Sequence, residues 1–188
     1  NKTLIFNYTV QSGDSSSNLN YVATNSLTLP AGVTIKDTAS NDATLTLPAT
    51  THNGLISANL FVDGISPTFL NASGSTSPFN DGTLTKTETF PDITLYFNEP
   101  VKIIDKVDLN KNIGISTPLG IGDKKINFTA NIQNGNLIID LDETDSDISF
   151  PHNQRIYIDI LPNTLQDIAG NVLPEIIGVN SYSILLNI

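Results

Sequence analysis

The sequence contains no cysteine, no methionine and no tryptophan. Without cysteine, disulfides cannot stabilise the fold, so its stability depends on a hydrophobic core or on bound metal ions. No apolar run approaches the roughly 20 residues that a membrane-spanning helix requires, which predicts that the chain does not insert into a membrane. Aromatic residues make up only 7% of the chain, and this argues against a module that grips a ligand with exposed aromatic side chains.

Basic residues are also scarce. The chain has nine lysines and arginines against 19 aspartates and glutamates, which gives a formal net charge of −10. This balance argues against nucleic acid as a partner, because phosphates require clusters of lysine and arginine. A divalent metal ion is the simplest cationic partner, since aspartate and asparagine oxygens are ligands that a hard cation such as calcium prefers.

Signatures of catalysis are missing as well. The sequence has no G-x-S-x-G, H-E-x-x-H, phosphate-binding-loop or dinucleotide-binding motif. Paired carboxylates occur in any acidic protein, and nothing marks two of them as a glycosidase pair. We therefore predict that the chain is not an enzyme and has no catalytic or organic-cofactor-binding residues.

The pattern that is present is that of β-strands. Thr, Val, Ile, Phe and Tyr alternate with polar residues in short runs, which clusters of Gly, Pro, Asn, Asp and Ser separate. Asn134-Gly135 predicts a hairpin turn, because both central positions of a type I′ turn need positive φ. We expect an all-β protein with strands at 4–10, 20–29, 43–47, 59–62, 93–97, 125–131, 137–141, 155–160 and 181–188.

One motif occurs twice. Residues 35–41 (IKDTASN) and residues 165–171 (LQDIAGN) both read as an apolar residue, a polar residue and then D-x-A-(G or S)-N. Each copy follows a β-rich run that ends in Leu-Pro, and further upstream residues 4–10 correspond to residues 137–143. We therefore interpret the chain as a tandem array of two related units.

The two copies differ in what precedes them, because residues 65–136 have no counterpart before Leu4. We expect a first domain, residues 1–64, that holds only the C-terminal part of its fold, and a complete second domain, residues 65–188. Residues 63–68 (DGISPT) form the expected linker, since Pro67 cannot extend a ladder from a central strand.

An incomplete first domain would leave apolar side chains without an opposing sheet, at Ile5, Leu27, Leu29, Leu45 and Leu47. Their exposure is unfavourable by about 25 cal/mol per Å² of apolar surface. Three outcomes are open: another chain completes the domain with its strands, the half-sheet packs on the neighbouring domain, or a smaller sandwich closes by itself. We favour the first.

The chain resembles known bacterial surface proteins in two places. Residues 1–68 resemble the repeats of very large surface adhesins, through the strand at 4–10, QSGD at 11–14, LNY at 19–21, the stretch 37–47 and the linker pattern V-D-x-x-x-P-T. Residues 69–188 are similar to Ig-like domains of S-layer proteins and adhesins, through FNEPV at 97–101 and D-x-A-G-N at 167–171. Ser40 departs from the pattern, where the family usually has glycine.

The resemblance implies tandem Ig-like Greek-key β-sandwiches, neighbouring Ig-like domains as partners, and an extracellular location on the bacterial cell surface. In such a sandwich the loops at 97–100 and 167–171 lie at the pole where the chain enters. Asp63, Glu99 and Asp167 are then expected to converge, and three carboxylates repel one another unless a cation lies among them. A calcium ion would neutralise them and fix the interdomain angle. The predicted metal-ligating set also includes Asn171 and, from the first copy, Asp37 and Asn41.

The same motif also has a purely structural interpretation. Asp and Asn side chains can cap their own backbone while Gly supplies positive φ, so D-x-A-G-N can be a turn without metal. Glu99 can in turn simply accept hydrogen bonds from loop amides. The acidic run at residues 140–147 is a weaker metal candidate, because it lacks EF-hand spacing, and we interpret it as a solvated strand end and loop.

The sequence and the resemblance together predict a non-enzymatic structural module of a bacterial cell-surface protein. It would be an adhesin stalk or a surface-layer building block, stiffened by calcium at the interdomain junction. Two alternatives stay open: an Ig-like module that binds glycan or protein through the loops at one pole, and an accessory domain of a secreted enzyme.

Overall fold

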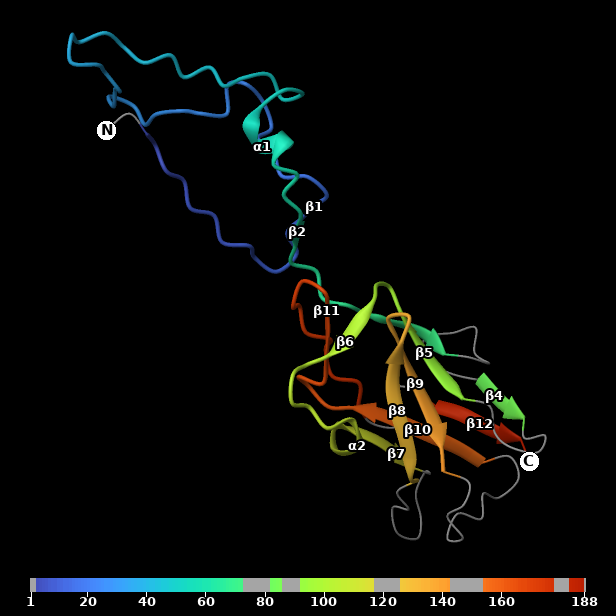
Figure 1. Ribbon diagram of the computed structural model, residues 1–188. Helices are drawn as coiled ribbons and strands as arrows, with labels where there is room; N and C mark the ends of the chain where they lie inside the picture. The colour runs from blue at the N-terminus through green and yellow to red at the C-terminus, as the bar shows by residue number, and fades with distance from the viewer. Residues whose placement is uncertain are drawn as a thin grey trace. The chain divides into compact units, whose positions relative to one another are not determined.

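The computed structural model describes residues 3–72, 82–85, 92–116, 126–142, 154–177 and 183–187. The chain divides into two units, Asn1–Ile65 and Ser66–Ile188 (Figure 1). Strands predominate in the described residues, and the helices there are two single turns, α1 (Gly54–Ser57) and α2 (Leu109–Asn112). The protein is thus largely β, as the sequence predicts.

Two four-stranded sheets make up most of the second unit. One has the strand order β3-β5-β9-β8, with only antiparallel pairings, and comprises β3 (Phe69–Ala72), β5 (Ile93–Phe97), β9 (Asn136–Leu141) and β8 (Phe128–Gln133). The other has the order β4-β12-β10-β7 and comprises β4 (Gly82–Thr85), β12 (Ser183–Asn187), β10 (Gln154–Ile160) and β7 (Ile113–Ser116). In the second sheet β4 and β12 are parallel, whereas the other pairings are antiparallel. A separate antiparallel pair joins β6 (Val101–Ile103) and β11 (Leu165–Asp167).

The core of the second unit lies between these sheets. Alternate residues point inward in β5, where Ile93, Leu95 and Phe97 are buried and Tyr96 is exposed. The fully buried side chains come from both four-stranded sheets and from β11: Ile93, Leu95, Ile115, Leu137, Ile139, Ile156, Ile158, Ile160 and Leu165. Each contributes about 1.5–3 kcal/mol by leaving water. The two sheets therefore form a β-sandwich around one hydrophobic core.

The predicted hairpin at Asn134-Gly135 is confirmed. It connects β8 to β9, and its two central residues have φ values of 51° and 77°. The backbone carbonyl of Gly135 also accepts a hydrogen bond from Val101 N at 2.9 Å, so the turn supports the start of β6.

Gly135→Ala is expected to destabilise the second unit. A Cβ at this position would lie 2.6 Å from Pro100 Cβ and 2.8 Å from its Cα, too close for an ordinary contact. The left-handed conformation adds about 1–2 kcal/mol for a residue with a Cβ. Denaturant unfolding measures the loss, and Asn134→Gly is the matched control because glycine adopts the same conformation without strain. An alanine variant as stable as the parent protein would contradict this account of the turn.

In the second unit, most of the predicted strands occur where the sequence places them. The predictions at 93–97, 137–141 and 155–160 agree with β5, β9 and β10 to within one residue. The strand predicted at 125–131 begins later, at Phe128, and ends at Gln133. Of the strand predicted at 181–188, residues 183–187 form β12, and 181, 182 and 188 lie outside the described residues.

In the first unit, the predictions of strands at 4–10, 20–29 and 43–47 are wrong. Of the strand predicted at 59–62, only Val62 lies in a strand, β2 (Val62–Asp63). Over residues 3–65 the structure has only the two-residue strands β1 (Ser15–Ser16) and β2, which pair with each other, and one isolated bridge between Lys36 and Asp42. Single bonds such as Leu19 N to Leu60 O and Leu47 N to Thr24 O join other segments. A strand needs a neighbouring ladder, and these segments have no continuous one within residues 3–65.

The first unit also lacks a hydrophobic core over residues 3–65. Only Val62 and Gly64 are buried there. The apolar positions expected to face a missing sheet are at best half-buried at Leu27, Leu29, Leu45 and Leu47, and Ile5 is 81% exposed. The first unit thus has the alternating apolar residues of a β-strand, but these residues are not packed in a core as they are in the second unit.

Candidate metal site

The two copies of the D-x-A-(G or S)-N motif fold into the same closed loop. In the second unit Asp167 N donates to Asn171 O at 3.0 Å, and Leu173 N donates to Leu165 O at 2.9 Å. The equivalent bonds in the first unit are Asp37 N to Asn41 O at 3.0 Å and Ala43 N to Ile35 O at 2.8 Å. A sequence repeat therefore corresponds to a repeat of local structure.

The Asp167 carboxylate organises its loop from inside. Its Oδ1 accepts bonds from Gly170 N at 2.6 Å and Asn171 N at 2.8 Å, and its Oδ2 accepts one from Asn171 Nδ2 at 2.7 Å. Gly170 has φ = 102°, which lets the chain turn back toward the carboxylate. The side chain is buried, with 1% of its surface exposed. A buried carboxylate needs such donors, because desolvation otherwise disfavours its charge.

The Asp37 carboxylate makes similar bonds on the surface, and the two from Asn41 correspond to those from Asn171. It accepts from Ala39 N, Asn41 N and Asn41 Nδ2, each at 2.9 Å, and Ser40 takes the left-handed position with φ = 70°. The bonds from Asn41, its side chain first, hold the pKa of Asp37 below the ordinary value. A lowered pKa means that these bonds favour the folded loop above the ordinary aspartate pKa. This contribution is lost as the pH falls through the lowered value.

These contacts give substance to the turn interpretation of the motif. In both loops the asparagine amide nitrogen donates to the aspartate carboxylate, and backbone amides complete the cap. Hydrogen bonds within the chain therefore close both loops. Asp37 also belongs to no group of three or more acidic or histidine side chains in the described part of the chain. Metal binding at Asp37 and Asn41 stays a prediction, and the geometry of the loop does not support it.

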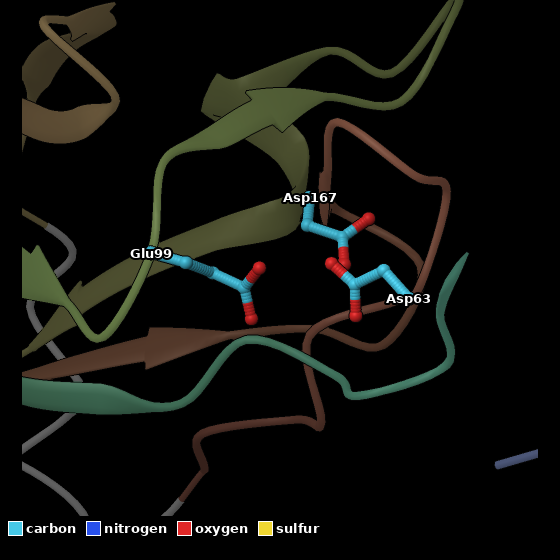
Figure 2. A group of neighbouring side chains, drawn as sticks. All are labelled: Asp63, Glu99 and Asp167. Atoms are coloured by element: carbon cyan, nitrogen blue, oxygen red, sulfur yellow. The ribbon is translucent and has the colours of Figure 1, made fainter. Parts of the chain in front are cut away.

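In the second unit the motif lies beside Glu99. The register of β6 and β11 pairs Asp167 with Val101, two residues after Glu99. One carboxylate oxygen of Glu99 lies within 4.8 Å of one of Asp167. Figure 2 shows Glu99 extending from the segment before β6 and Asp167 from the end of β11. Lys102 Nζ donates to Ile168 O at 3.3 Å, so a lysine also contacts this loop.

The beginning of the second unit is attached next to Glu99. Asn98 Oδ1 accepts a bond from Thr68 N at 2.5 Å, and Asn98 N donates to Thr68 O at 3.0 Å. The sequence analysis quoted Asn98 within the FNEPV motif but gave it no role. This role could have been predicted from the position of Asn98 between a buried strand end and Glu99, because a short amide side chain there can hydrogen-bond to a neighbouring backbone segment.

Two other metal candidates from the sequence remain: Asp63 and the acidic run at residues 140–147. Asp63 belongs to the first unit, where its Oδ1 accepts a bond from Ile65 N at 3.0 Å. In the acidic run, Asp140 is exposed and Asp142 half-buried, while 143–147 lie outside the described residues. Within the second unit the pair of Glu99 and Asp167 is thus the part of the predicted site that the fold brings together. Two close carboxylates of this kind suit a hard divalent cation.

Comparisons with known proteins identify no relative. No protein-family model matches the chain, and no curated protein matches its sequence. One solved structure is similar at a distance: the N-terminal part of the bacterial S-layer protein SbsC, with a TM-score of 0.39 and 13% sequence identity. The similarity covers 71% of this chain and 25% of that chain, so this chain spans about a quarter of it. In the described residues no helix is long and apolar enough to cross a membrane.

Proposed function

We propose that the chain is a non-enzymatic structural module of a bacterial cell-surface protein, built from consecutive Ig-like units and acting as part of a stalk or surface layer. The observation that carries the proposal is the occurrence of one closed loop, with matching hydrogen bonds, in each of the two units. Repetition of a local structure along one chain is typical of modular arrays. The net charge of −10 and the β-sandwich of the second unit agree with this class.

We further propose that calcium stiffens the junction by binding Glu99, Asp167 and Asp63. Thr68 is hydrogen-bonded to Asn98, which precedes Glu99 in the sequence. Asp63 precedes Thr68 by five residues, and a chain spans at most about 3.3–3.6 Å per residue, so its Cα lies within about 18 Å of that of Thr68. This tether raises the concentration of the third carboxylate near the pair. Calcium would then link the two units, and a cation would offset the repulsion among three acids.

Calcium is expected to raise the melting temperature of the whole chain. A site held at 100 times its dissociation constant stabilises by about 2.7 kcal/mol, or about 5–10 °C for a protein of this size. Glu99→Gln should remove most of the shift, because it takes one charged ligand from the pair and leaves the bonds of the Asp167 loop in place. Calorimetry in calcium and in EDTA measures both.

The matched control is Glu175→Gln, which removes one exposed charge from the second unit and, among the described residues, belongs to no acidic group that could hold a metal ion. This variant should keep the full calcium shift. X-ray scattering adds a test of the mechanical role: with calcium the particle should have a nearly fixed maximum dimension, and chelation should broaden the distribution of distances. Superimposable melting curves in calcium and EDTA would refute the metal proposal, and a collapsed particle in both conditions would refute the stalk.

A further inference from the structure

The sequence contains two Asn-Gly dipeptides, Asn53-Gly54 in the first unit and Asn134-Gly135 in the second. Asparagine is one of the thermolabile residues of proteins. Its pair with glycine is especially reactive, because no side chain hinders the approach of the glycine backbone nitrogen to the asparagine side chain. By sequence alone, the two dipeptides should lose their side-chain amides at equal rates.

The reaction is spontaneous deamidation, and water is its only co-reactant. The backbone nitrogen of glycine forms a bond to Cγ of asparagine, the bond from Cγ to Nδ2 breaks, and ammonia leaves with the proton of the glycine nitrogen. Water then opens the resulting succinimide ring at either carbonyl. Opening at Cγ gives aspartate, whereas opening at the backbone carbonyl gives isoaspartate, in which the chain runs through the side chain. The rate depends on how freely Cγ and the glycine nitrogen can meet.

The side chain of Asn53 is held at both of its polar atoms. Its Oδ1 accepts a bond from Ile56 N at 2.9 Å, which caps α1. Its Nδ2 donates to Ala49 O at 3.1 Å and to Asn20 Oδ1 at 3.2 Å. The reacting amide is thus fixed in the orientation that the cap requires, and ammonia can leave only after both donor bonds are broken.

The backbone at Asn53 is fixed as well. Its carbonyl oxygen accepts bonds from Ser57 N at 3.1 Å and from Ser57 Oγ at 2.8 Å. This carbonyl belongs to the same peptide group as the nitrogen of Gly54, so the bonds also hold the attacking atom. Ring closure at Asn53 therefore requires local unfolding of α1.

Asn134 lies at the tip of the β8–β9 hairpin, where such restraints are absent among the described residues. The residue is exposed, and its side chain forms no hydrogen bond with a described residue. Its carbonyl oxygen accepts a long bond from Asn136 Nδ2, at 3.4 Å. The ladder of β8 and β9 ends at the pair of Gln133 and Asn136, so the turn residues lie outside it. Cγ of Asn134 can therefore reach the nitrogen of Gly135 while the two strands stay paired.

We propose that Asn134 is a site of spontaneous deamidation in the folded chain, whereas the fold protects Asn53. Both products change the turn. Aspartate adds a negative charge, and isoaspartate adds a backbone atom to a turn whose length sets the register of the two strands. Because Gly135 O accepts the bond from Val101 N, an altered turn also weakens the start of β6.

Mass spectrometry of digests from the whole chain, after incubation at mildly alkaline pH, tests the proposal. A displacement of the reacting atoms by about 1 Å can cost about 100-fold in rate, so Asn134 should convert at least about tenfold faster than Asn53. The same incubation in concentrated urea is the control, because urea breaks the bonds of Asn53 and the two rates should then be similar. No conversion of Asn134, equal rates in the folded chain, faster conversion of Asn53, or a difference that persists in urea would overturn the proposal.

Two variants test the protection of Asn53. Ser57→Ala removes one bond to the Asn53 carbonyl. Asn20→Ala removes one acceptor of the Asn53 Nδ2. Each variant should speed the conversion of Asn53 and leave that of Asn134 unchanged, because Asn134 lies in the other unit. If neither variant changed the rate at Asn53, the hydrogen bonds would not be what protects it.

Asn134→Gly tests the effect on the turn. Glycine keeps the left-handed conformation and has no amide to lose. After long incubation the parent chain should melt at a lower temperature than before, whereas Asn134→Gly should melt as it did at the start. A parent chain that has converted at Asn134 and still melts at its original temperature would refute this effect.

Discussion

Leu137→Ala is expected to lower the free energy of unfolding of the second unit by about 2–5 kcal/mol. Leu137 is fully buried in β9, which lies between β5 and β8 in its sheet, and faces the core that both sheets share. Removal of its side chain leaves a cavity that the surrounding strands cannot fill, because they are fixed by ladders on both sides. Urea unfolding followed by far-ultraviolet circular dichroism measures the loss.

Leu4→Ala is the matched control at the corresponding position of the repeat. Leu4 is more than half exposed, so the same truncation should change stability by no more than about 0.5 kcal/mol at a concentration where the chain is monomeric. Equal losses for the two substitutions would mean that the first unit possesses a core of its own. Such a result would contradict the difference in burial between the two units.

The strands of the second unit could be predicted because their signal is local and complete. In β5 residues of the apolar face alternate with residues of the outer face, and β9 does the same apart from Ile138, an apolar residue on its outer face; each residue on the apolar face of either strand is buried. The turn between β8 and β9 was equally readable, since Asn134-Gly135 satisfies a backbone requirement that few other pairs meet. Short strands such as β6 and β11 were missed, because three residues are too few to establish a period.

The first unit shows why the same reading fails elsewhere. Residues 4–10 carry a β-strand pattern as good as that of β9, yet they form no strand. Strand stability comes from cross-strand pairs, and those depend on partners that a local pattern does not supply.

The hydrogen bonds within the two loops could be predicted from the sequence, but the burial of their aspartates could not. The spacing of D-x-A-(G or S)-N is sufficient to predict that aspartate caps its own turn, and both loops do so. Nothing in the motif distinguishes a buried aspartate from an exposed one. That difference comes from β6, which pairs with β11 in the second unit, and it depends on contacts between residues more than 60 positions apart.

Asp167→Ala is expected to destabilise the second unit by about 2–4 kcal/mol in EDTA, where metal binding makes no contribution. The substitution removes the acceptor of three hydrogen bonds and leaves the amides of Gly170 and Asn171 without it in a partly buried loop. Unpaired buried donors retain their full desolvation cost. Because β11 pairs with β6 through Asp167 itself, disorder of the loop should also weaken that pair. Thermal unfolding in EDTA gives the size of the loss.

Asp37→Ala provides the comparison, because Asp37 accepts corresponding bonds in an exposed loop. Water can replace the lost acceptor there, so the expected change is within about 0.5 kcal/mol. Asp167→Asn should fall between the two alanine variants, since its amide keeps one oxygen for the backbone donors but opposes a second amide to Asn171 Nδ2. If Asp37→Ala proved as destabilising as Asp167→Ala, burial would not be what separates the two loops, and the carboxylate of the second unit would have no special structural role.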